Sequence, residues 1–474
     1  MATPRVLFVT SEMYPLAHTG GLGDVAAALP AALRALGADV RVMLPMYRSV
    51  RERAVKHARP VAVPGTDGVS IVAARTPDTD VPVLLVDSPA LFDRDGSLYV
   101  DKSGADWPDN SIRFAILSKV ASIVASASSP IGWSPQLLHA NDWQTGLAVA
   151  LLATRREGRP PTVFTIHNLT FLGLLPRSAF AELGLPLQAF GIHGVEFYGD
   201  VSLMKAGISY ADRITTVSPT YAREIQTRDF GAGLDGLLSE RSTHLSGILN
   251  GADYARWNPT TDPHIAARYD AMSLDGKKAC KAALQRELKL EERDEAFVIG
   301  SVSRLTTQKG LDLLMRALPS VLDAKTQIVL LGSGDRGLER AWVDAARRHP
   351  GRIGVRTGFD EPLSHRIEAG VDAFVMPSRF EPCGLNQMYS LRYGTPPIVY
   401  RVGGLADTVD DGVTGFSFVD ASPAALVKAI KRARTTFADP HAWRAMQLRG
   451  MSKDFSWPRS AKQYLDVYSQ LLKA

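Results

Sequence analysis

Short apolar runs, each followed by a loop and a helical stretch, recur along the chain. Residues 6–10 form such a run, a glycine-containing loop follows, and an Ala/Leu-rich stretch ends at Gly37 before a second apolar run at 40–44. Strands that alternate with helices in this way predict right-handed parallel βαβ units. Ligands bind off the carboxyl ends of the strands in such units, so these loops are the places to look for chemistry.

The same alternation continues to the middle of the chain. A helix is expected at about 110–125, further strands are expected at 162–166 and 214–217, and 51–105 contains shorter strands and polar loops. The segment 247–259 is rich in Gly, Asn and Pro, which is typical of a connection between domains. We therefore expect a first domain that covers residues 1–246.

The second half repeats the pattern. Its predicted strands lie at 296–302, 327–331, 353–356, 373–376 and about 395–399. From Ser422 onward the chain reads as helical, apart from a Pro-containing break at 454–460. We expect a second domain at 247–456 and a last helix within 457–474 that points elsewhere. Two parallel α/β halves of similar size imply a cleft between them.

Polar side chains gather at strand ends in the first half. Gly20 and Gly21 precede the first helix, where glycines let the backbone approach a bound group, although this is not the full dinucleotide fingerprint. His139 and Asp142 follow one predicted strand, and His167 follows the next. Parallel strands deliver such residues to one edge of a sheet, where reacting groups belong. Each residue taken singly could equally be a satisfied polar group in a turn.

The second half offers cations and one carboxylate at the corresponding places. Arg304 and Lys309 follow the first strand of this half, and this pair suits a diphosphate. SRFEPCGLNQ, residues 378–387, follows a later strand and holds Glu381 before the amides of Gly384 and Leu385. A carboxylate and free amides could grip a polyol and its phosphate. The alternatives are surface charge and an ordinary capped turn.

Composition narrows the class of protein. The chain has 474 residues, so two or three domains are expected, and its net charge of +5 with a pI near 9.1 is mild. No block of basic residues indicates nucleic-acid binding. Cys280 and Cys383 lie too far apart in sequence to indicate a disulfide framework or a zinc site, which favours the cytoplasm. We expect neither a signal peptide nor a membrane span, because the apolar runs are too short.

Two acidic triplets leave a metal site open as an alternative. Residues 78–80 read Asp-Thr-Asp and residues 93–95 read Asp-Arg-Asp, and either could be a metal-binding motif of another transferase architecture. Such triplets also arise by chance in acidic loops. The prediction adopted here is that the protein uses no metal and no cofactor.

Taken together, HTGGLGDV, HANDW, TIHN, SRLTTQKGLDLL, SRFEPCGLNQ and GGLADTV resemble the motifs of bacterial glycogen synthases and plant starch synthases, in order and spacing over nearly the whole chain. The resemblance implies a GT-B fold, in which two Rossmann-like domains face each other across a cleft and the C-terminal helix crosses back to the first. It also implies a retaining glucosyltransferase that moves glucose from ADP-glucose to the non-reducing end of an α-1,4-glucan such as glycogen, without a metal.

The resemblance assigns roles to residues of this chain. Catalytic roles fall on Glu381, which would hold sugar hydroxyls, on His167 and Asp142 near the glucose, and on Arg304 and Lys309 at the diphosphate. Substrate binding falls on a second group, namely His18, Gly20, Gly21, Cys383, Gly384, Leu385 and Gly404. Glycosyl transfer places negative charge on the departing phosphate, so two cations and helix amides could replace a metal.

Two positions, His18 and Asn141, depart from what the resemblance predicts, and a third, Tyr389, separates the synthases from sucrose-type transferases. His18 stands where a lysine is usual, and it is neutral or only partly charged near pH 7. Asn141 stands where a histidine is usual, so proton shuttling at this position is not expected. Tyr389 stands eight positions after Glu381, where many related transferases have a second glutamate. Without that carboxylate, a double displacement of the glycosidase kind is not favoured, and front-face attack with the leaving phosphate as base is.

Other functions stay open at this point. UDP-glucose or another acceptor would fit the same fold, because the loops do not reveal contacts to the base. A non-catalytic glucan- or nucleotide-binding protein should have lost some of Arg304, Lys309 and Glu381, and all three are present. A Rossmann oxidoreductase would need the full glycine fingerprint together with an acidic residue about 20 positions on, and only Asp39 is available.

Overall fold

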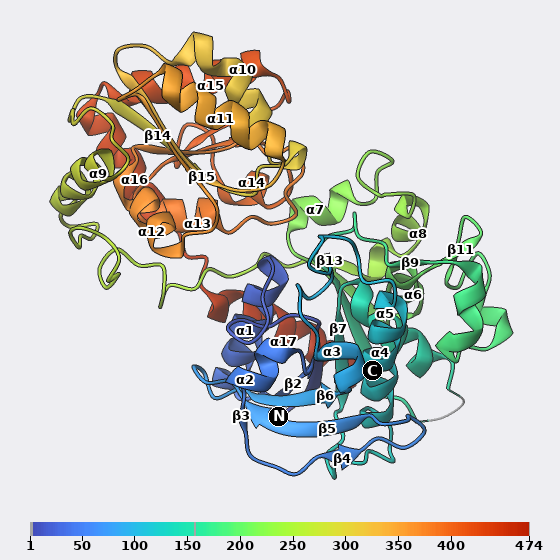
Figure 1. The fold of residues 1–474 in the computed structure, drawn as a ribbon. Coiled ribbons are helices and arrows are strands. Elements are labelled where there is room, and N and C mark those ends of the chain that lie inside the picture. The colour runs from blue at the N-terminus through green and yellow to red at the C-terminus, as the bar shows by residue number, and fades with distance from the viewer. Residues whose placement is uncertain (1–2, 156–157, 474) are drawn as a thin grey trace. The chain divides into compact units, whose positions relative to one another are not determined.

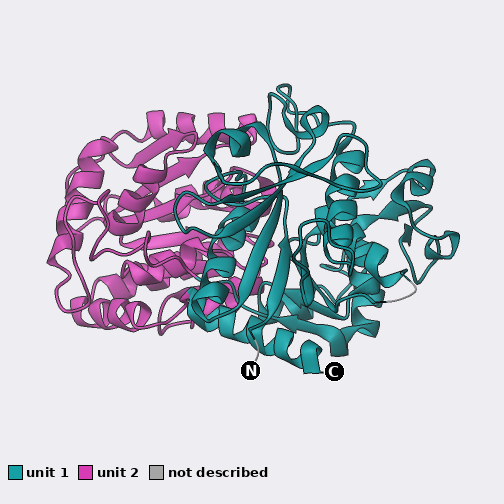
Figure 2. Cartoon of the chain, turned by 90° about the horizontal axis from the view of Figure 1, so that it is seen from below, with its two compact units in different colours: residues 1–251, 457–474 teal, residues 252–456 magenta. Residues whose placement is uncertain are grey.

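The computed structural model describes residues 3–155 and 158–473, which fall into two compact units. Unit 1 contains residues 1–251 and 457–474, and unit 2 contains residues 252–456 (Figure 2). The chain therefore enters unit 2 slightly later than the boundary at 246 that the sequence indicates. It returns to unit 1 for its last helix.

A mainly parallel sheet lies at the centre of unit 1 (Figure 1). The strand order is β13-β12-β8-β7-β1-β2-β6-β5-β3, with β4 beside β5. The chain starts in the middle at β1, moves outward through β2, and comes back to the other side of β1 as β7. Ligands bind where a strand order reverses in this way. The strands are β1 Arg5–Val9, β2 Asp39–Pro45, β3 Val55–Lys56, β4 Val61–Ala62, β5 Ser70–Arg75, β6 Pro82–Asp87, β7 Leu137–Asn141, β8 Thr162–Ile166, β12 Arg213–Thr216 and β13 Leu245–Gly247.

Helices and a small second sheet complete unit 1. Gly146 allows helices α5 and α6 to pack closely, because a Cβ at this position would lie 2.0 Å from the Leu203 carbonyl oxygen. The α-helices are α1 Gly21–Ala35, α2 Arg48–Arg53, α3 Pro89–Phe92, α4 Asn110–Val124, α5 Trp143–Ala153, α6 Leu203–Tyr210, α7 Pro219–Glu224, α8 Asp235–Glu240 and α17 Trp457–Lys473. The small sheet contains β9 Leu174–Leu175, β10 Glu196–Phe197 and β11 Asp200–Ser202, and 3-10 turns lie at Arg177–Leu183, Leu187–Ala189 and Ser242–His244.

The last helix, α17, packs on α1 of unit 1, which confirms the predicted return of the chain. It begins at Trp457, a few residues before the end of the break expected from the sequence, because Pro458 is tolerated in the first turn of a helix. Tyr464 and Tyr468 of α17 are fully buried. The Tyr468 hydroxyl lies 2.7 Å from His139 Nδ1 on β7, so the end of the chain is joined to the core of the first sheet.

Unit 2 is a second parallel α/β layer structure. Its sheet has the order β16-β15-β14-β17-β18-β19, so the chain again starts in the middle and reverses, here between β14 and β17. The strands are β14 Phe297–Val302, β15 Thr326–Gly332, β16 Ile353–Thr357, β17 Ala373–Met376, β18 Pro397–Tyr400 and β19 Phe416–Phe418. The helices are α9 Asp275–Glu287, α10 Leu311–Val321, α11 Arg336–Arg348, α12 Glu361–Gly370, α13 Asn386–Arg392, α14 Gly403–Thr408, α15 Pro423–Phe437 and α16 Pro440–Met451, with a 3-10 turn at Thr307–Lys309.

Alternation along the strands of unit 2 produces two apolar cores. Phe297 and Ile299 of β14 point into one core, which α10, α11 and α15 cover, and Val298 points into the other, which α12 and α14 help to cover. Figure 1 shows these helices on the two faces of the sheet. A strand buried on both faces needs apolar residues throughout, which is why it reads as a continuous run in the sequence.

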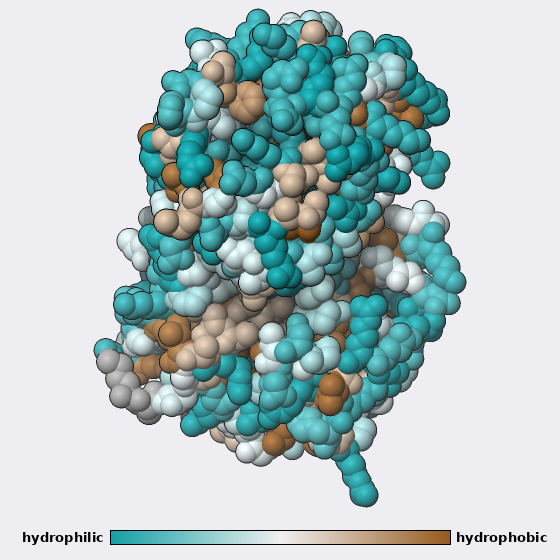
Figure 3. Space-filling model, turned by 90° about the vertical axis from the view of Figure 1, so that its left-hand side faces the viewer, coloured by the Kyte–Doolittle hydropathy of each residue, from teal (hydrophilic) through white to brown (hydrophobic). Residues whose placement is uncertain are grey.

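The surface in Figure 3 is mostly hydrophilic, with apolar residues in small patches. Exposed large apolar side chains include Met272 and Phe359 of unit 2 and Leu187 and Tyr198 of unit 1. Among the described residues, none of the helices combines the length and the apolar composition that crossing a membrane requires.

Candidate active site

The loop between β1 and α1 is organised by a carboxylate that the sequence analysis did not single out. Glu12 is buried, and it accepts hydrogen bonds from the backbone N–H and the hydroxyl of Thr19, both at 2.7 Å, and from the Gly20 N–H at 3.2 Å. The Tyr99 hydroxyl donates to the same carboxylate at 2.7 Å. Glu12 therefore fixes the conformation of the glycine loop from its inner side.

His18 and the two predicted glycines lie on this loop. His18 Nε2 is 3.4 Å from Asp24 Oδ2, and both side chains are about one-third exposed. The imidazole lies against Gly23, where a Cβ would be 2.6 Å from His18 Cδ2. Gly20 precedes the first turn of α1, and a Cβ at Gly20 or Gly21 would meet only open space. The start of this 15-residue helix is thus approachable by a bound group.

Asp142 joins the ends of β7 and β8. Its carboxylate Oδ1 accepts hydrogen bonds from the N–H groups of His167, at 2.8 Å, and Asn168, at 3.3 Å. Its backbone has φ 57° and ψ 179°, a conformation that L residues rarely adopt and that is found mainly where function requires it. Burial raises the pKa of the Asp142 carboxyl to about 7.

The two histidines expected at this edge have different surroundings. His167 Nε2 lies 3.0 Å from Asn141 Oδ1 at the carboxyl ends of β8 and β7. His139 instead points into the core, between the Tyr468 and Thr165 hydroxyls at 2.7 and 2.6 Å. Burial lowers the pKa of each histidine to about 3, so both are neutral at physiological pH. Of the two, only His167 belongs with Asp142 at the predicted site.

In unit 2 the central feature is an ion pair between two loops at the reversal of the sheet. Lys309, in the loop after β14, places its Nζ 2.6 Å from Oε2 of Glu381, in the loop after β17. Their side chains are only 17% and 8% exposed, so the pair is largely shielded from water. The sequence predicted both residues for the site, and the structure brings them into direct contact.

Arg379 ties the same two loops together. Its guanidinium makes a bidentate pair with Asp312 at 2.7 Å on both arms and donates to the Thr307 carbonyl at 2.6 Å. The Arg379 N–H donates to the Gln308 carbonyl at 2.8 Å, and Gln308 Nε2 donates back to the Phe380 carbonyl at 3.1 Å. These bonds fix the position of the loop that holds Lys309 relative to the loop that holds Glu381. Arg379 was not predicted for the site, because it is partly exposed and its partner, Asp312, lies 67 positions away in sequence.

Arg304 differs from Lys309. Its side chain is exposed and forms no ion pair within the described part of the chain. It precedes Leu305, which is buried, and follows β14 at the same sheet edge as Lys309. Arg304 and Lys309 thus stand in one strand-end loop, as predicted, and their role at a diphosphate stays a prediction.

The remaining predicted residues form the backbone around Glu381. Gly384 has φ +71°, and a Cβ there would lie 2.5 Å from Gln387 Oε1. Leu385 caps α13. Gly404 lies against Cys383, where a Cβ would be 2.2 Å from the carbonyl oxygen, and its N–H donates to the Pro382 carbonyl at 3.1 Å. GGLADT therefore supports the Glu381 loop through backbone packing, and direct contact of Gly404 with a substrate stays a prediction.

Tyr389 stands where many related transferases have a second glutamate, and its ring is stacked on another aromatic ring. It lies on α13, parallel to Trp257 with ring centroids 4.3 Å apart. Trp257 is stacked on its other partner, His365, at 3.7 Å. Tyr389 is therefore part of an aromatic stack within unit 2.

The acidic triplets and the described carboxylates elsewhere do not assemble into a metal site. Asp80 pairs with Arg75 at 2.7 Å, and Asp93 pairs with Arg48 at 2.8 Å. Within residues 3–155 and 158–473, no group of three His, Cys, Asp or Glu side chains is placed to hold a metal ion.

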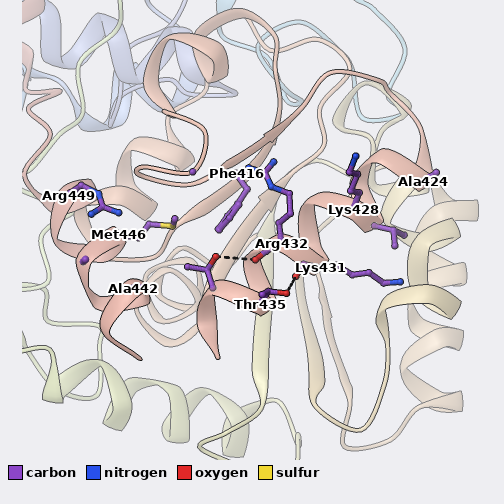
Figure 4. Close-up of a pocket in the computed structure, with 13 residues that line it drawn as sticks. Phe416, Ala424, Lys428, Lys431, Arg432, Thr435, Ala442, Met446 and Arg449 are labelled. Atoms are coloured by element: carbon purple, nitrogen blue, oxygen red, sulfur yellow. Dashed lines mark hydrogen bonds between the residues drawn. The ribbon is translucent and has the colours of Figure 1, made fainter. Parts of the chain in front are cut away.

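A groove of about 840 Å³ lies elsewhere in unit 2, next to α15 and α16 (Figure 4). Its lining includes Phe416 and Met446, together with exposed cations such as Lys428, Lys431 and Arg449. It contains none of the residues that the sequence predicts for the site, so the candidate active site rests on the strand-end loops instead.

Comparison with known proteins identifies the class. A model described as the starch synthase catalytic domain matches residues 5–240, and one described as glycosyl transferases group 1 matches residues 285–444. The catalytic domain of starch synthase IV from Arabidopsis thaliana, solved bound to ADP and acarbose, superposes with a TM-score of 0.89 at 32% identity over 100% of both chains. Sucrose-phosphate synthase from Thermosynechococcus elongatus shares the fold, with a TM-score of 0.63 at 18% identity and 99% coverage of both chains. The protein is a GT-B glycosyltransferase.

Curated relatives narrow this class to a family. A glycogen synthase of Nitrosomonas europaea is 49% identical over 99% of this chain and 98% of its own length. Another, from Aromatoleum aromaticum, is 51% identical over 98% of this chain and 96% of its own length. The chain belongs to the glycogen synthase family of glucosyltransferases, which confirms the resemblance inferred from its motifs.

Proposed function

We propose that the protein transfers glucose from ADP-glucose to the non-reducing end of an α-1,4-glucan, with retention of the anomeric configuration, in glycogen synthesis. The observation that carries the proposal is the shielded Lys309–Glu381 pair at the sheet reversal of unit 2, with the exposed Arg304 in the same loop as Lys309. The neighbours' functions support it, since the matched relatives are glycogen synthases and the starch synthase was solved with ADP.

The charged side chains of unit 2 determine the proposed chemistry. Arg304 and Lys309 would bind the diphosphate and stabilise the negative charge that develops as it leaves, a task that a preorganised cationic site performs without reorganisation. Glu381 would bind sugar hydroxyls and stabilise the positive charge on the ring. Aligning Lys309 beside Glu381 keeps both groups oriented before the donor binds.

The acceptor hydroxyl would attack on the face that the diphosphate leaves. A retaining double displacement needs two carboxylates about 5 Å apart, and the position that could supply the second is occupied by the stacked Tyr389. The departing phosphate would then take the proton of the attacking hydroxyl. The new bond joins the glucan oxygen to the anomeric carbon, and the bond to the ADP oxygen breaks.

Donor choice is the direct test of this proposal. Purified protein would be given glycogen with radiolabelled ADP-glucose or UDP-glucose, and label that amylase can release would be counted. We expect a kcat/KM for ADP-glucose well above that for UDP-glucose. A higher value for UDP-glucose would contradict the donor assignment, and no transfer from either would contradict the whole proposal. The cytoplasmic location expected from the two distant cysteines also stays a prediction.

A further inference from the structure

Asn141 occupies a buried position where its orientation is fixed. It is the last residue of β7 and has no exposed surface. Its Nδ2 donates to the Val9 carbonyl at 3.0 Å and lies 3.4 Å from the His139 carbonyl. Backbone carbonyls only accept hydrogen bonds, so turning the amide over would set its oxygen against two other oxygens. The Asn141 Oδ1 must therefore face away from these carbonyls.

The direction of Oδ1 determines the protonation of a neighbouring ring. Oδ1 lies 3.0 Å from His167 Nε2, and an amide oxygen can only accept. His167 Nε2 must therefore carry a proton. Because burial keeps this imidazole neutral, its other nitrogen, Nδ1, carries none. Within the described part of the chain, no residue forms a hydrogen bond with Nδ1, although the His167 side chain is only 9% exposed.

We infer that Asn141 is a positioning residue that holds His167 in the Nε2-protonated form, so that Nδ1 presents a lone pair to a hydroxyl group of the reacting sugar. This inference deepens the proposed function and rests on it for the identity of the sugar. A histidine, usual at position 141, could act as donor or acceptor and would leave the tautomer undetermined. The asparagine removes that choice, since its amide does not titrate.

The backbone of the site supports the same geometry. The carboxylate of Asp142, the residue after Asn141, accepts a hydrogen bond from the backbone N–H of His167. Two consecutive residues therefore bind the backbone and the ring of this histidine. The two contacts are made by different atoms and are separately removable. Replacing Asn141 should alter the tautomer of His167 while the backbone bond to Asp142 remains.

Nitrogen NMR of the resting protein tests the tautomer directly. Histidine labelled with ¹⁵N would be incorporated, and the His167 signals would be assigned by their loss in His167→Gln. We expect a protonated Nε2 and an unprotonated Nδ1 at pH 7. A proton on Nδ1 in the wild type would overturn the inference. This measurement needs no turnover, so its outcome is independent of whether the transferase assay succeeds.

Asn141→Leu then tests the positioning role. We expect a mixed or reversed His167 tautomer and a fall in kcat of roughly 10- to 100-fold, by analogy with the loss of the hydrogen-bond partner that orients a metal-ligating histidine. Donor KM should change little, because neither Asn141 nor His167 is among the residues predicted to bind the diphosphate. If this variant does not fold, Asn141→Ser, which is too short to reach Nε2, should give the same tautomer change. An unchanged tautomer in a folded variant would overturn the inference.

Thr145→Val is the matched control. Thr145 is buried in the same turn, and its hydroxyl donates to the Asn141 carbonyl at 2.8 Å without touching His167. It should lower the melting temperature but leave the His167 tautomer as in the wild type. If Thr145→Val reduced kcat as much as Asn141→Leu, the role of Asn141 would be structural only.

Discussion

At the scale of single residues, the Lys309–Glu381 pair carries the most specific expectation. Glu381→Gln keeps the shape of the side chain but removes its charge, and it leaves Lys309 without its partner at 2.6 Å. We expect kcat to fall by about 10²- to 10³-fold, in line with the loss of one preorganised electrostatic group, and donor affinity to change far less. Steady-state kinetics would measure both.

Two controls sharpen the Glu381 test. Glu292→Gln changes an exposed glutamate of the same unit and should leave kcat unchanged. Mass spectrometry of wild-type enzyme quenched during turnover should find no glucose attached to Glu381. A covalent adduct there would contradict front-face attack, and a large rise in donor KM with constant kcat would assign Glu381 to ground-state binding.

His18 should make donor binding depend on pH. If it takes the place of the usual lysine, only its protonated form supplies a positive charge. Donor KM should therefore be lower at low pH than at high pH in the wild type and should vary less with pH in His18→Lys. His57→Lys, at an exposed position of unit 1, is the control. Identical pH profiles for wild type and His18→Lys would remove His18 from the phosphate site.

Asp142 should cost stability at high pH. Its carboxyl pKa is raised from 3.8 to about 7, so between these values the folded protein binds more protons than the unfolded chain. Stability therefore falls as pH rises through this range, and the cost is fully present above pH 7. Asn has the same branching and nearly the same size as Asp, so the substitution adds no backbone strain at this position. Asp142→Asn should thus raise the free energy of unfolding at pH 8, by at most about 4 kcal/mol, and by less at pH 5. The melting temperature should rise with it.

Thermal unfolding at the two pH values checks the expectation for Asp142. Asp67→Asn, at an exposed position, should shift the melting temperature equally little at both. A gain from Asp142→Asn that is the same at pH 5 and pH 8 would show that the carboxyl does not titrate near 7. Loss of activity in the same variant would mark Asp142 as a site where stability is given up for function.

At the scale of elements, the bonds of Arg379 predict that a residue with no assigned substrate contact affects the rate. Arg379→Gln breaks the bidentate pair with Asp312 and the bond to the Thr307 carbonyl, which frees the loops that hold Lys309 and Glu381. A misplacement of about 1 Å can cost about 10²-fold, so kcat/KM should fall by roughly 10- to 100-fold.

Two further variants separate the tie between these loops from general charge effects. Arg316→Gln removes a 69% exposed arginine whose guanidinium is 3.8 Å from the same Asp312, and it should leave kcat/KM unchanged. Asp312→Asn should add little in the Arg379→Gln background, because both changes break one connection. Additive losses would mean that the two residues act separately.

The same elements show how far sequence reasoning reaches. β1, β8, β14, β15 and β17 are buried on both faces, so each reads as an apolar run and was predicted close to its observed bounds. β7 extends to Asn141 and so includes His139, which was expected to follow the strand. The small sheet β9–β11 and the 3-10 turns near it were not predicted, because strands of two or three residues carry no period that a pattern can reveal.

A site residue could be predicted only where it stands in a strand-end loop together with the other residues of its motif. Lys309 and Glu381 stand in strand-end loops, and the structure brings them together. Glu12 was overlooked because its importance comes from contact with Tyr99, 87 positions away, which no local pattern encodes. His139 shows the opposite case, since its place in a strand-end motif suggested the site while α17 covers it in the core.

At the scale of the whole molecule, the two units share one sheet topology. Each has a parallel sheet whose order reverses next to its first strand, at β1 and β7 in unit 1 and at β14 and β17 in unit 2. The predicted residues lie in the loops beyond these strands and beyond their neighbours β8 and β18. Unit 1 supplies the neutral His167 and Asp142 there, whereas unit 2 supplies Arg304 and the Lys309–Glu381 pair.

This division of charge predicts that catalysis does not need a metal ion. Arg304 and Lys309 provide two cationic side chains in one loop of unit 2, which could stabilise the negative charge that develops on a departing diphosphate. Activity should therefore be unchanged after dialysis against EDTA and assay in its presence. Arg304→Gln should lower kcat/KM, and added Mg²⁺ should not restore it.

A metal-dependent transferase would behave differently in the same assay. Its activity would disappear in EDTA and return with Mg²⁺ or Mn²⁺, and attention would return to the acidic triplet at 78–80. In that case Asp80→Asn should abolish the metal response, whereas on the present interpretation it only breaks an exposed ion pair with Arg75, which is worth little. Full activity of Asp80→Asn in EDTA, beside a strongly impaired Arg304→Gln, would locate the stabilising charge on the protein's own cations.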